Sequence, residues 1–533
     1  MAKRTVVFFG MLMLAMFLSV LLVFRVSSGP GLARTARQQS SYKLTVAATR
    51  GTIYDCNLTA LTGAGETEYS AAVVPGAGAA AALDRALPAS RMEDLYPTLT
   101  GGKPFALRLP RRVDAEGIDV FALRNRYPDS GRAVHILGYL DGSGKGAAGV
   151  EKAYDSVLSG NRGRITVTYR VDALNHVLPG EEKKIEDTSN LGKSGVVLTL
   201  DNYIQTVAEQ AADRYLTKGA IVVAEVPSGR LRAVVSRPDY GQNDIAPVLR
   251  AADSPLLNRA LSAYSVGSVF KLVAAAAALE HGVPPDYSYT CTGGIEVSGG
   301  VFHCFNSQSH GRETMEQAIA NSCNTYFVNL MQKVPRKDFL AMASALGFGK
   351  SFELAPGLSS GAGVLPSLTS LGVPRALANF SFGQGELTAT PLQVTAMVNA
   401  IASGGVYTDP TLYAGRVDEK LAYTDRAAEP KGTRVMSEKN AALLRKFMRA
   451  SIESGTSLKG KPLRTTAGAK TATAQTGRVL NGAELDESWF TGFFPYDDPK
   501  YAVTVFAEGG DGGGTTCGPA FREIADCISE ALN

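Results

Sequence analysis

Hydrophobic positions follow three different patterns along the chain, which divide it into residues 1–26, 27–190 and 191–533. The first part contains an unbroken apolar run from Val6 to Phe24. This run is close to the ~20 residues that a helix needs to cross a bilayer. A cleaved signal peptide is the alternative, although its apolar core normally has only about 7–15 residues. We therefore predict one membrane-spanning helix that anchors the chain.

The second part, residues 27–190, is predicted to be rich in β-structure. Residues 26–47 are polar and include Gly29-Pro30-Gly31, which is typical of a stalk. From residue 49 to residue 175, short β-like runs alternate with turns and alanine-rich stretches. The charged run 181–187 indicates a solvent-exposed linker or edge.

The third part, residues 191–533, shows strands at both ends and helices between them. Branched apolar runs at 220–226 and 231–235 flank a Pro-Ser-Gly turn, which predicts a hairpin. Residues 500–507 predict another strand, and a closing helix is expected from Phe521 onward. Strands from both ends of a region with a helical centre indicate an α+β fold layered around one antiparallel sheet.

An alanine-rich run at residues 272–279 predicts a helix, and Ser268 and Lys271 stand at its start. Residues three apart share one face of a helix, so the two side chains are expected side by side. A neutral lysine amine in that position takes the serine proton and makes the hydroxyl a nucleophile without a histidine. The alternative is an ordinary helix with an exposed lysine, because this spacing arises by chance roughly once or twice in such a chain.

Two later tripeptides supply partners for that pair. The first is Ser322-Cys323-Asn324, in which the Ser322 hydroxyl can pass a proton from Lys271 to a leaving amine. The Asn324 amide both donates and accepts hydrogen bonds, so it can hold the lysine and a substrate carbonyl together. Cys323 has no evident base beside it and is predicted to be a packed thiol.

The second tripeptide is Lys470-Thr471-Ala472. Lys470 and Thr471 are suited to bind the terminal carboxylate of a peptide. A second cation near Lys271 also disfavours the charged form of that lysine, and burial acts in the same direction. Both effects supply the free amine that a general base requires near neutral pH.

The order S-x-x-K, S-x-N and K-T-x resembles penicillin-binding proteins and serine β-lactamases. Longer stretches resemble the class B penicillin-binding proteins, which are monofunctional, membrane-anchored peptidoglycan D,D-transpeptidases. The stretches that carry this resemblance are Arg50–Asp55, Gly149–Asp155, Leu198–Asp201 with Gln205, Leu256–Ala260, His310-Gly311, Gly383–Gly385, Thr390–Gln393 and Trp489–Phe493.

The resemblance implies a domain order and the remaining site residues. It implies a membrane anchor at 1–26, a non-catalytic pedestal of the dimerisation-domain type at 27–190, and a transpeptidase domain at 191–533. It also implies an oxyanion hole made by the backbone N–H groups of Ser268 and Thr473. Ala472 departs from the glycine of the family motif, and its methyl group either narrows the substrate groove or is absorbed by a small shift.

The activity implied by the resemblance is cross-linking of peptidoglycan stem peptides through an acyl-enzyme at Ser268, with inhibition by β-lactams. The alternatives are a D,D-carboxypeptidase or β-lactamase type of hydrolase, and a non-catalytic penicillin-binding assembly or sensor protein. No region the size of a glycosyltransferase precedes the pedestal, so a membrane glycosyltransferase partner is expected. The motifs do not distinguish a role in division, elongation or sporulation.

The implied substrate also decides the expected location. Lys3 and Arg4 precede the apolar run, but Arg25 and Lys43 follow it, so positive charges alone do not set the orientation. Because the substrate lies outside the membrane, we expect a single-pass cell-membrane protein with an extracytoplasmic catalytic domain. The net charge of +4 is small for 533 residues, and nothing indicates binding to nucleic acid.

The six cysteines suit an extracytoplasmic protein with few disulfides. Cys291 with Cys304, and Cys517 with Cys527, are candidate pairs, although connectivity is not readable from sequence. Zinc has less support, because His303 beside Cys304 does not complete a set of four metal ligands. His310 is predicted to be a hydrogen-bonded structural residue. Neither a cofactor nor a metal is expected.

Overall fold

The computed structural model describes residues 2–28, 40–63, 65, 67–128, 131–160, 163–189, 193–480 and 483–532. The predicted stalk glycines and proline at 29–31 lie outside these residues. The chain divides into two compact units. The first unit comprises Met1–Arg50, Ala64–Arg126 and Asn161–Gly192, and the second comprises Gly51–Gly63, Tyr127–Gly160 and Lys193–Asn533.

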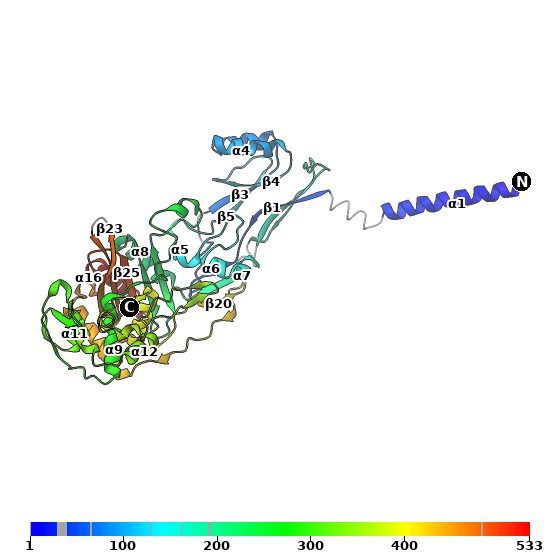
Figure 1. The fold of residues 1–533 in the computed structure, drawn as a ribbon. Helices are drawn as coiled ribbons and strands as arrows, with labels where there is room; N and C mark the ends of the chain where they lie inside the picture. Colours follow the sequence, from blue (N-terminus) through cyan, green and yellow to red (C-terminus); the bar gives the residue numbers. More distant parts are fainter. Residues whose placement is uncertain are drawn as a thin grey trace. The chain divides into compact units, whose positions relative to one another are not determined.

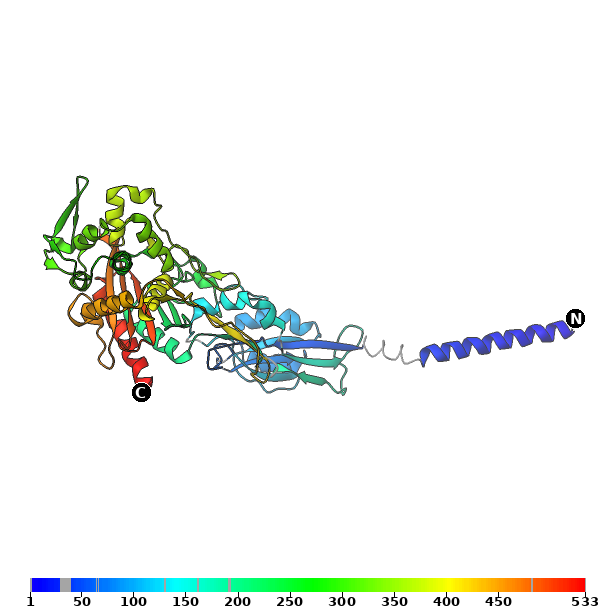
Figure 2. The same cartoon turned by 90° about the horizontal axis from the view of Figure 1, so that it is seen from below.

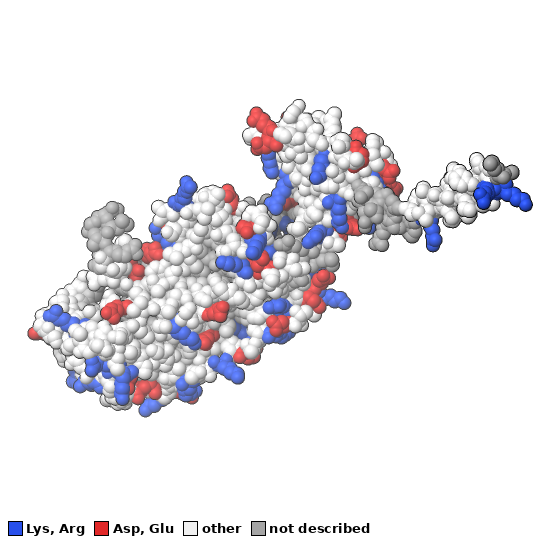
Figure 3. Space-filling model, turned by 45° about the vertical axis from the view of Figure 1, so that its right-hand side comes forward, with Lys and Arg blue, Asp and Glu red and all other residues white. Residues whose placement is uncertain are grey.

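The predicted N-terminal helix is present as α1 (Ala2–Ser27). An 18-residue window within its stretch Lys3–Ser27 has a mean hydropathy of 2.8, and none of that window is buried. Among the described residues it is the one helix long and apolar enough to span a membrane. Figure 3 shows basic side chains only at the two ends of this helix. The rest of the surface in this view carries basic and acidic groups interspersed, without a basic stripe.

Two three-stranded sheets make up most of the first unit. Their strands are β1 (Ser41–Ala48), β6 (Arg164–Arg170) and β7 (Lys184–Asp187) in one sheet, and β4 (Phe105–Leu109), β3 (Thr67–Val73) and β5 (Ile118–Arg124) in the other, accompanied by helices α3 (Ala77–Asp84) and α4 (Ala89–Thr100). The predicted charged run is confirmed as an exposed edge, because β7 lies at the end of its sheet. Lys43 and Glu186 form an exposed ion pair there, with 2.9 Å between Nζ and Oε2.

A five-stranded antiparallel sheet forms the centre of the second unit, as predicted. In spatial order its strands are β10 (Leu231–Arg237), β9 (Gly219–Glu225), β25 (Tyr501–Glu508), β24 (Ala483–Phe494) and β23 (Gly468–Leu480). The predicted hairpin is the β9–β10 pair, and the predicted strand near residue 500 is β25. Strand β23 therefore lies at an edge of the described sheet.

Both faces of this sheet are buried, which explains the continuous apolar runs in its strands. Side chains alternate between faces. In β9, Ile221 and Val223 belong to the core under helices α8 (Asn202–Tyr215) and α17 (Gly518–Leu532). The neighbouring Ala220 and Val222 belong to the core on the opposite face. Figures 1 and 2 show the sheet, with its last strands in orange to red, enclosed between helices.

Helix α9 (Lys271–Glu280) lies in the middle of that second core. Its residues from Lys271 to Leu279 are all buried, which fits a helix that is apolar around its whole circumference. The helices around it are α10 (Met315–Ala320), α11 (Asn324–Met331), α12 (Arg336–Ala345), α13 (Pro374–Ser381), α14 (Pro391–Ala402) and α15 (Glu438–Ser454). Together they form the helical part expected between the terminal strands.

Short elements complete the second unit. A four-stranded sheet contains β2 (Thr52–Tyr54), β8 (Gly195–Leu198), β20 (Tyr413–Val417) and β21 (Tyr423–Arg426). The paired short strands are β11 (Tyr264–Ser265) with β18 (Thr388–Ala389), β12 (Tyr289–Cys291) with β15 (Gly311–Glu313), β13 (Gly294–Val297) with β14 (Gly300–His303), β16 (Glu353–Ala355) with β17 (Leu358–Ser359), and β19 (Val406–Tyr407) with β22 (Thr433–Arg434). The short helices are α5 (Val134–Leu137), α6 (Gly149–Ala153), α7 (Asp155–Gly160) and α16 (Gly513–Thr516).

Asp201 is the N-cap of helix α8, and its carboxylate accepts hydrogen bonds from the backbone N–H groups of Tyr203 and Ile204 at 2.9 and 3.1 Å. We predict that Asp201→Ala lowers the stability of the second unit by about 1 kcal/mol, because two helix N–H groups lose their acceptor. Asp201→Asn keeps an acceptor and serves as the control. Thermal unfolding followed by circular dichroism checks this, and equal losses in both variants would contradict the capping role.

Candidate active site

Ser268 lies in a turn of 3-10 helix, Gly267–Phe270, immediately before α9. The sequence predicted it in the first turn of the helix itself, so the helix begins three residues later than expected. Gly267 has a φ of 62°, and a Cβ there would come within 3.0 Å of the Ala474 Cβ on β23. Glycine therefore lets this turn pack directly against the edge strand and places Ser268 beside it.

Gly383 holds the same turn from the other side. Its carbonyl accepts a hydrogen bond from the Gly267 N–H at 2.9 Å. Its φ is 85°, and a Cβ at this position would overlap the Gly267 carbonyl. The Gly383–Gly385 run noted in the sequence thus has a packing reason, because only glycine fits both the backbone conformation and the space.

The Lys271 amine is the centre of the site. Its Nζ lies 3.0 Å from Ser268 Oγ, 2.7 Å from Asn324 Oδ1, and 2.6 and 3.2 Å from the carbonyl and hydroxyl oxygens of Ser322. A neutral amine has two N–H groups and one lone pair. If the N–H groups donate to the two nearest oxygens, the lone pair is left to accept a proton from a hydroxyl.

Burial favours that neutral form. Lys271 is fully buried, which lowers its pKa to about 8, although nearby Cys323, Cys304 and Glu313 act in the opposite direction. About one tenth of such an amine is uncharged at pH 7. Lys470 is also fully buried, and this burial together with repulsion from Lys271 holds the pKa of Lys470 well below its ordinary value.

Ser322 adopts an unusual backbone conformation, with a φ of 59°. Left-handed conformations are uncommon outside glycine and are typical of functional sites. Here the conformation directs both oxygens of Ser322 at Lys271. Lys470 Nζ also lies 2.9 Å from Ser322 Oγ, so this hydroxyl bridges the two lysines. Ser268, Ser322 and Asn324 are partly exposed, whereas both amines are buried.

The third motif lies on the edge strand β23. Thr471 Oγ1 donates a hydrogen bond to Thr456 Oγ1 at 2.9 Å, and Thr473 Oγ1 accepts one from the Gly513 N–H at 3.4 Å. Alternate backbone groups of an edge strand have no partner strand and are directed outward. The Ala472 methyl group is only 3% exposed and belongs to the core beside Gly267. The methyl group is therefore accommodated inside the protein.

Three contributors to the site were not predicted from the sequence. Thr456 holds Thr471, Gly383 holds the turn of Ser268, and the backbone carbonyl of His303 accepts a hydrogen bond from Asn324 Nδ2 at 2.8 Å. The glycine run was visible in the sequence, but its role was not. Nothing in the sequence signals the other two contacts, because each depends on how distant segments pack.

Neither candidate pair of cysteines forms a disulfide. All six cysteines are free thiols. The sulfur atoms of Cys291 and Cys304 are 3.7 Å apart, well beyond the ~2.05 Å of a disulfide bond. Cys323 is a buried thiol as predicted, and it is also the N-cap residue of α11, where its sulfur accepts a hydrogen bond from the Tyr326 N–H at 3.4 Å.

Comparison with known proteins agrees with this geometry. The sequence model of the penicillin binding protein transpeptidase domain matches residues 219–526. Stage V sporulation protein D of Bacillus subtilis is 31% identical over 437 residues, which cover 78% of this chain and 65% of that protein. Peptidoglycan D,D-transpeptidase PbpA of Mycolicibacterium smegmatis is 29% identical over 413 residues, or 72% of this chain and 79% of that protein.

A solved structure gives the same fold. Penicillin binding protein 3 of Mycobacterium tuberculosis, complexed with aztreonam, superposes with a TM-score of 0.67 at 24% identity, covering 92% of this chain and 97% of that chain. The present chain spans slightly less than two thirds of the length of the sporulation protein. With the family match over more than half of its residues, the chain belongs to the penicillin-binding protein transpeptidase family.

Proposed function

We propose that this protein is a serine D,D-transpeptidase that cross-links peptidoglycan stem peptides through an acyl-enzyme. The observation that carries the proposal is the 3.0 Å contact between the buried Lys271 amine and the partly exposed Ser268 hydroxyl. Nucleophilic catalysis requires a nucleophile and a base within hydrogen-bond distance of each other, and further groups that orient the base. Ser322 and Asn324 are those orienting groups.

In the first step, Ser268 Oγ attacks the carbonyl carbon of the penultimate D-alanine while its proton passes to neutral Lys271. The carbonyl oxygen becomes an oxyanion, which the backbone N–H groups of Ser268 and Thr473 stabilise. Each donor of this kind typically contributes about 3 kcal/mol to lowering the barrier. The position of Thr473 on an edge strand next to the turn of Ser268 supports this role.

In the second step, the bond to the terminal D-alanine breaks. The proton held by Lys271 reaches the leaving amine through the Ser322 hydroxyl, which lies 3.2 Å from Lys271 Nζ and 2.9 Å from Lys470 Nζ. The amine of a neighbouring stem peptide then attacks the carbonyl carbon of the acyl-enzyme and gives a proton to Lys271. Lys271 passes this proton to Ser268 Oγ as the ester bond breaks, which regenerates the Ser268 hydroxyl and the neutral amine. Lys470 and Thr471 hold the terminal carboxylate of the donor peptide, as they would the carboxylate of a β-lactam.

The remaining assignments belong to the same proposal. Helix α1 would anchor the chain in the cell membrane with the catalytic domain outside, where the substrate lies. Residues 27–190 would form the non-catalytic pedestal and residues 191–533 the transpeptidase domain. Glycan polymerisation would come from a membrane glycosyltransferase partner.

The direct test is to incubate the full chain in detergent with a fluorescent penicillin and to locate the adduct by mass spectrometry. We expect one adduct, at Ser268, and none in Ser268→Ala, because among the described residues only the hydroxyls of Ser268 and Ser322 lie within hydrogen-bond distance of Lys271 Nζ, and Ser268 is the closer. Ser454→Ala, an exposed serine at the end of α15, serves as the control and should be labelled like the unaltered protein. An adduct at Ser322, or labelling of Ser268→Ala, would contradict the mechanism.

The lifetime of that adduct distinguishes transfer from hydrolysis. A transpeptidase is expected to retain the penicilloyl group, because its site lacks the base with which a β-lactamase activates water against the acyl-enzyme. Release of the label within seconds would favour the hydrolase alternative. A stable adduct together with exchange of the terminal D-alanine of a stem-peptide analogue for a labelled D-amino acid would support the transferase.

Restoring the family glycine at position 472 tests the non-catalytic alternative. We predict that Ala472→Gly changes the rate of penicillin acylation by less than about threefold, because the methyl group faces the core. The same variant should lose about 1–2 kcal/mol of stability through lost burial and greater backbone freedom. Stopped-flow acylation and thermal unfolding measure the two effects. An acceleration of tenfold or more would mean that the methyl group obstructs the groove.

A further inference from the structure

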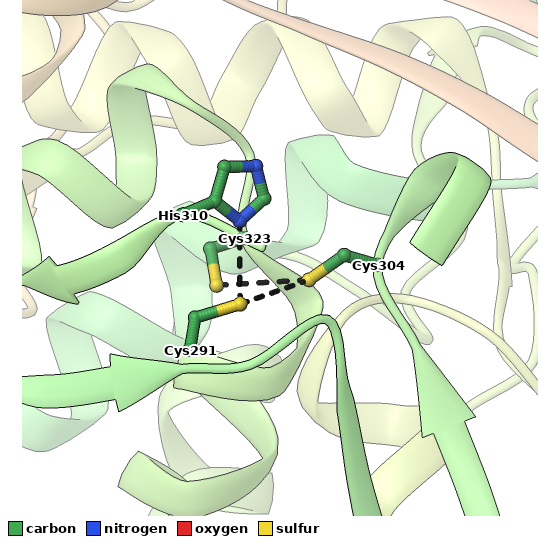
Figure 4. A group of neighbouring side chains, drawn as sticks. All are labelled: Cys291, Cys304, His310 and Cys323. Atoms are coloured by element: carbon green, nitrogen blue, oxygen red, sulfur yellow. Dashed lines mark hydrogen bonds between the residues drawn. The ribbon is translucent and has the colours of Figure 1, made fainter. Parts of the chain in front are cut away.

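Four side chains that the proposed mechanism does not use converge next to the catalytic tripeptide (Figure 4). Cys291 ends β12, Cys304 follows β14, His310 precedes β15, and Cys323 lies between Ser322 and Asn324. Their ligand atoms all lie within 4.8 Å of one another. The three cysteines are buried, and the imidazole is only 9% exposed. We call this group the thiol–imidazole cluster.

The spacing of the cluster matches the dimensions of a tetrahedral metal site. Sγ of Cys304 lies 3.7 Å from Sγ of Cys291 and 3.7 Å from Sγ of Cys323. Nδ1 of His310 lies 3.4 Å from Sγ of Cys291. Zinc bonds of ~2.3 Å to sulfur and ~2.0 Å to nitrogen at tetrahedral angles require about 3.8 Å between sulfurs and about 3.5 Å between sulfur and nitrogen.

Backbone N–H groups point at two of the sulfur atoms. The Gly293 N–H donates to Cys291 Sγ, and the Tyr326 N–H at the start of α11 donates to Cys323 Sγ, each at 3.4 Å. Thiolates are the form in which cysteine binds a metal, and hydrogen bonds to the ligand atoms orient them.

A buried carboxylate also lies beside the cluster. Glu313 is 2% exposed, and its Oε1 accepts a hydrogen bond from Asn321 Nδ2 at 2.6 Å. Its other oxygen, Oε2, has no hydrogen-bond partner among the described residues and lies 3.9 Å from His310 Nδ1. Glu313 therefore lies between the imidazole of the cluster and Asn321, the residue before Ser322.

We propose that Cys291, Cys304, His310 and Cys323 bind one zinc ion, which fixes the turn that carries Ser322 and Asn324. Four protein ligands and no open position are the mark of a structural zinc site. Sulfur and imidazole ligands in a tetrahedral arrangement select zinc over magnesium or calcium, which prefer oxygen. On binding, the three thiols release their protons to solvent and the imidazole binds through Nδ1 as the neutral ring.

The consequence for the active site, which rests on the proposed function, follows from the position of Cys323. Its two neighbours provide three of the four oxygens that surround the Lys271 amine. The Asn324 amide also donates to the carbonyl of His303, which adjoins Cys304. A metal bound to Cys304 and Cys323 therefore connects the end of the β13–β14 hairpin to the turn that carries Ser322. This connection stabilises the left-handed conformation of Ser322. In this role the ligands are positioning residues.

The test begins with the metal content of the full chain, purified in detergent with a non-thiol reductant. We expect about one zinc per chain by inductively coupled plasma mass spectrometry. The cobalt-substituted protein should show the visible bands of tetrahedral Co²⁺ and thiolate charge transfer. Cys304→Ser and His310→Ala should each weaken zinc binding at least about tenfold, whereas Cys527→Ser, outside the cluster, should bind zinc like the unaltered protein.

Removal of zinc by a chelator should slow penicillin acylation at least about tenfold, and added zinc should restore it. Unaltered protein that stays fully reduced yet binds neither zinc nor cobalt would overturn the inference, as would a disulfide within the cluster of the isolated protein. Metal binding and disulfide formation are both measured on the unaltered protein, so these results do not depend on whether a variant folds. Zinc-bound protein that penicillin does not acylate would refute the proposed function alone, and metal-free protein acylated at the full rate would refute the positioning role.

Discussion

A lysine amine buried away from solvent is the constraint on which the site depends. A charged ammonium group in that position is costly, so the protein must either pair it with an anion or lower its pKa. Lys271 is surrounded by neutral oxygens: one carbonyl, one amide oxygen and two hydroxyls. The amine of a second buried lysine, Lys470, lies 2.9 Å from the Ser322 hydroxyl, which also contacts Lys271. Both features favour a free amine, which in the proposed mechanism takes the proton of Ser268.

The fold supplies this environment from segments that are far apart in the sequence. Helix α9, which is buried along its length, carries Lys271 into the core. The left-handed backbone of Ser322 brings a carbonyl and a hydroxyl to the same amine. Strand β23 adds Lys470 from an edge of the described sheet. The glycines at 267 and 383 allow these segments to approach closely enough for direct hydrogen bonds.

Much of this organisation was predictable because it depends on local patterns. The branched apolar runs at 220–226 and 231–235 predicted the β9–β10 hairpin, and the alanine-rich run predicted α9. The spacing of Ser268 and Lys271 placed them on one face, although the turn is a 3-10 helix. The strain at Ser322, the contact from Thr456 and the support from Gly383 have no local signature, because each arises from tertiary packing.

The thiol–imidazole cluster shows a different limit of prediction from the sequence. Its ligands are spaced as C-x12-C-x5-H-x12-C, a pattern present in the sequence. His303 is the last residue of β14 and is an alternative to His310 as a ligand, and spacing alone does not choose between them. Nδ1 of His303 lies 3.4 Å from Ser307 Oγ, whereas the pairing of β12 with β15 places His310 beside Cys291. The fold of the backbone therefore decides that His310, and not His303, joins the cluster.

The dependence of penicillin acylation on pH tests the central role of Lys271 most directly. Since only the uncharged amine accepts the Ser268 proton, the second-order rate constant should rise from about pH 6, pass through half its maximum near the lysine pKa of about 8, and level off above about pH 9. Circular dichroism over the same range shows that the fold is intact. A rate that stays constant, or that falls as the pH rises through this range, would contradict the account.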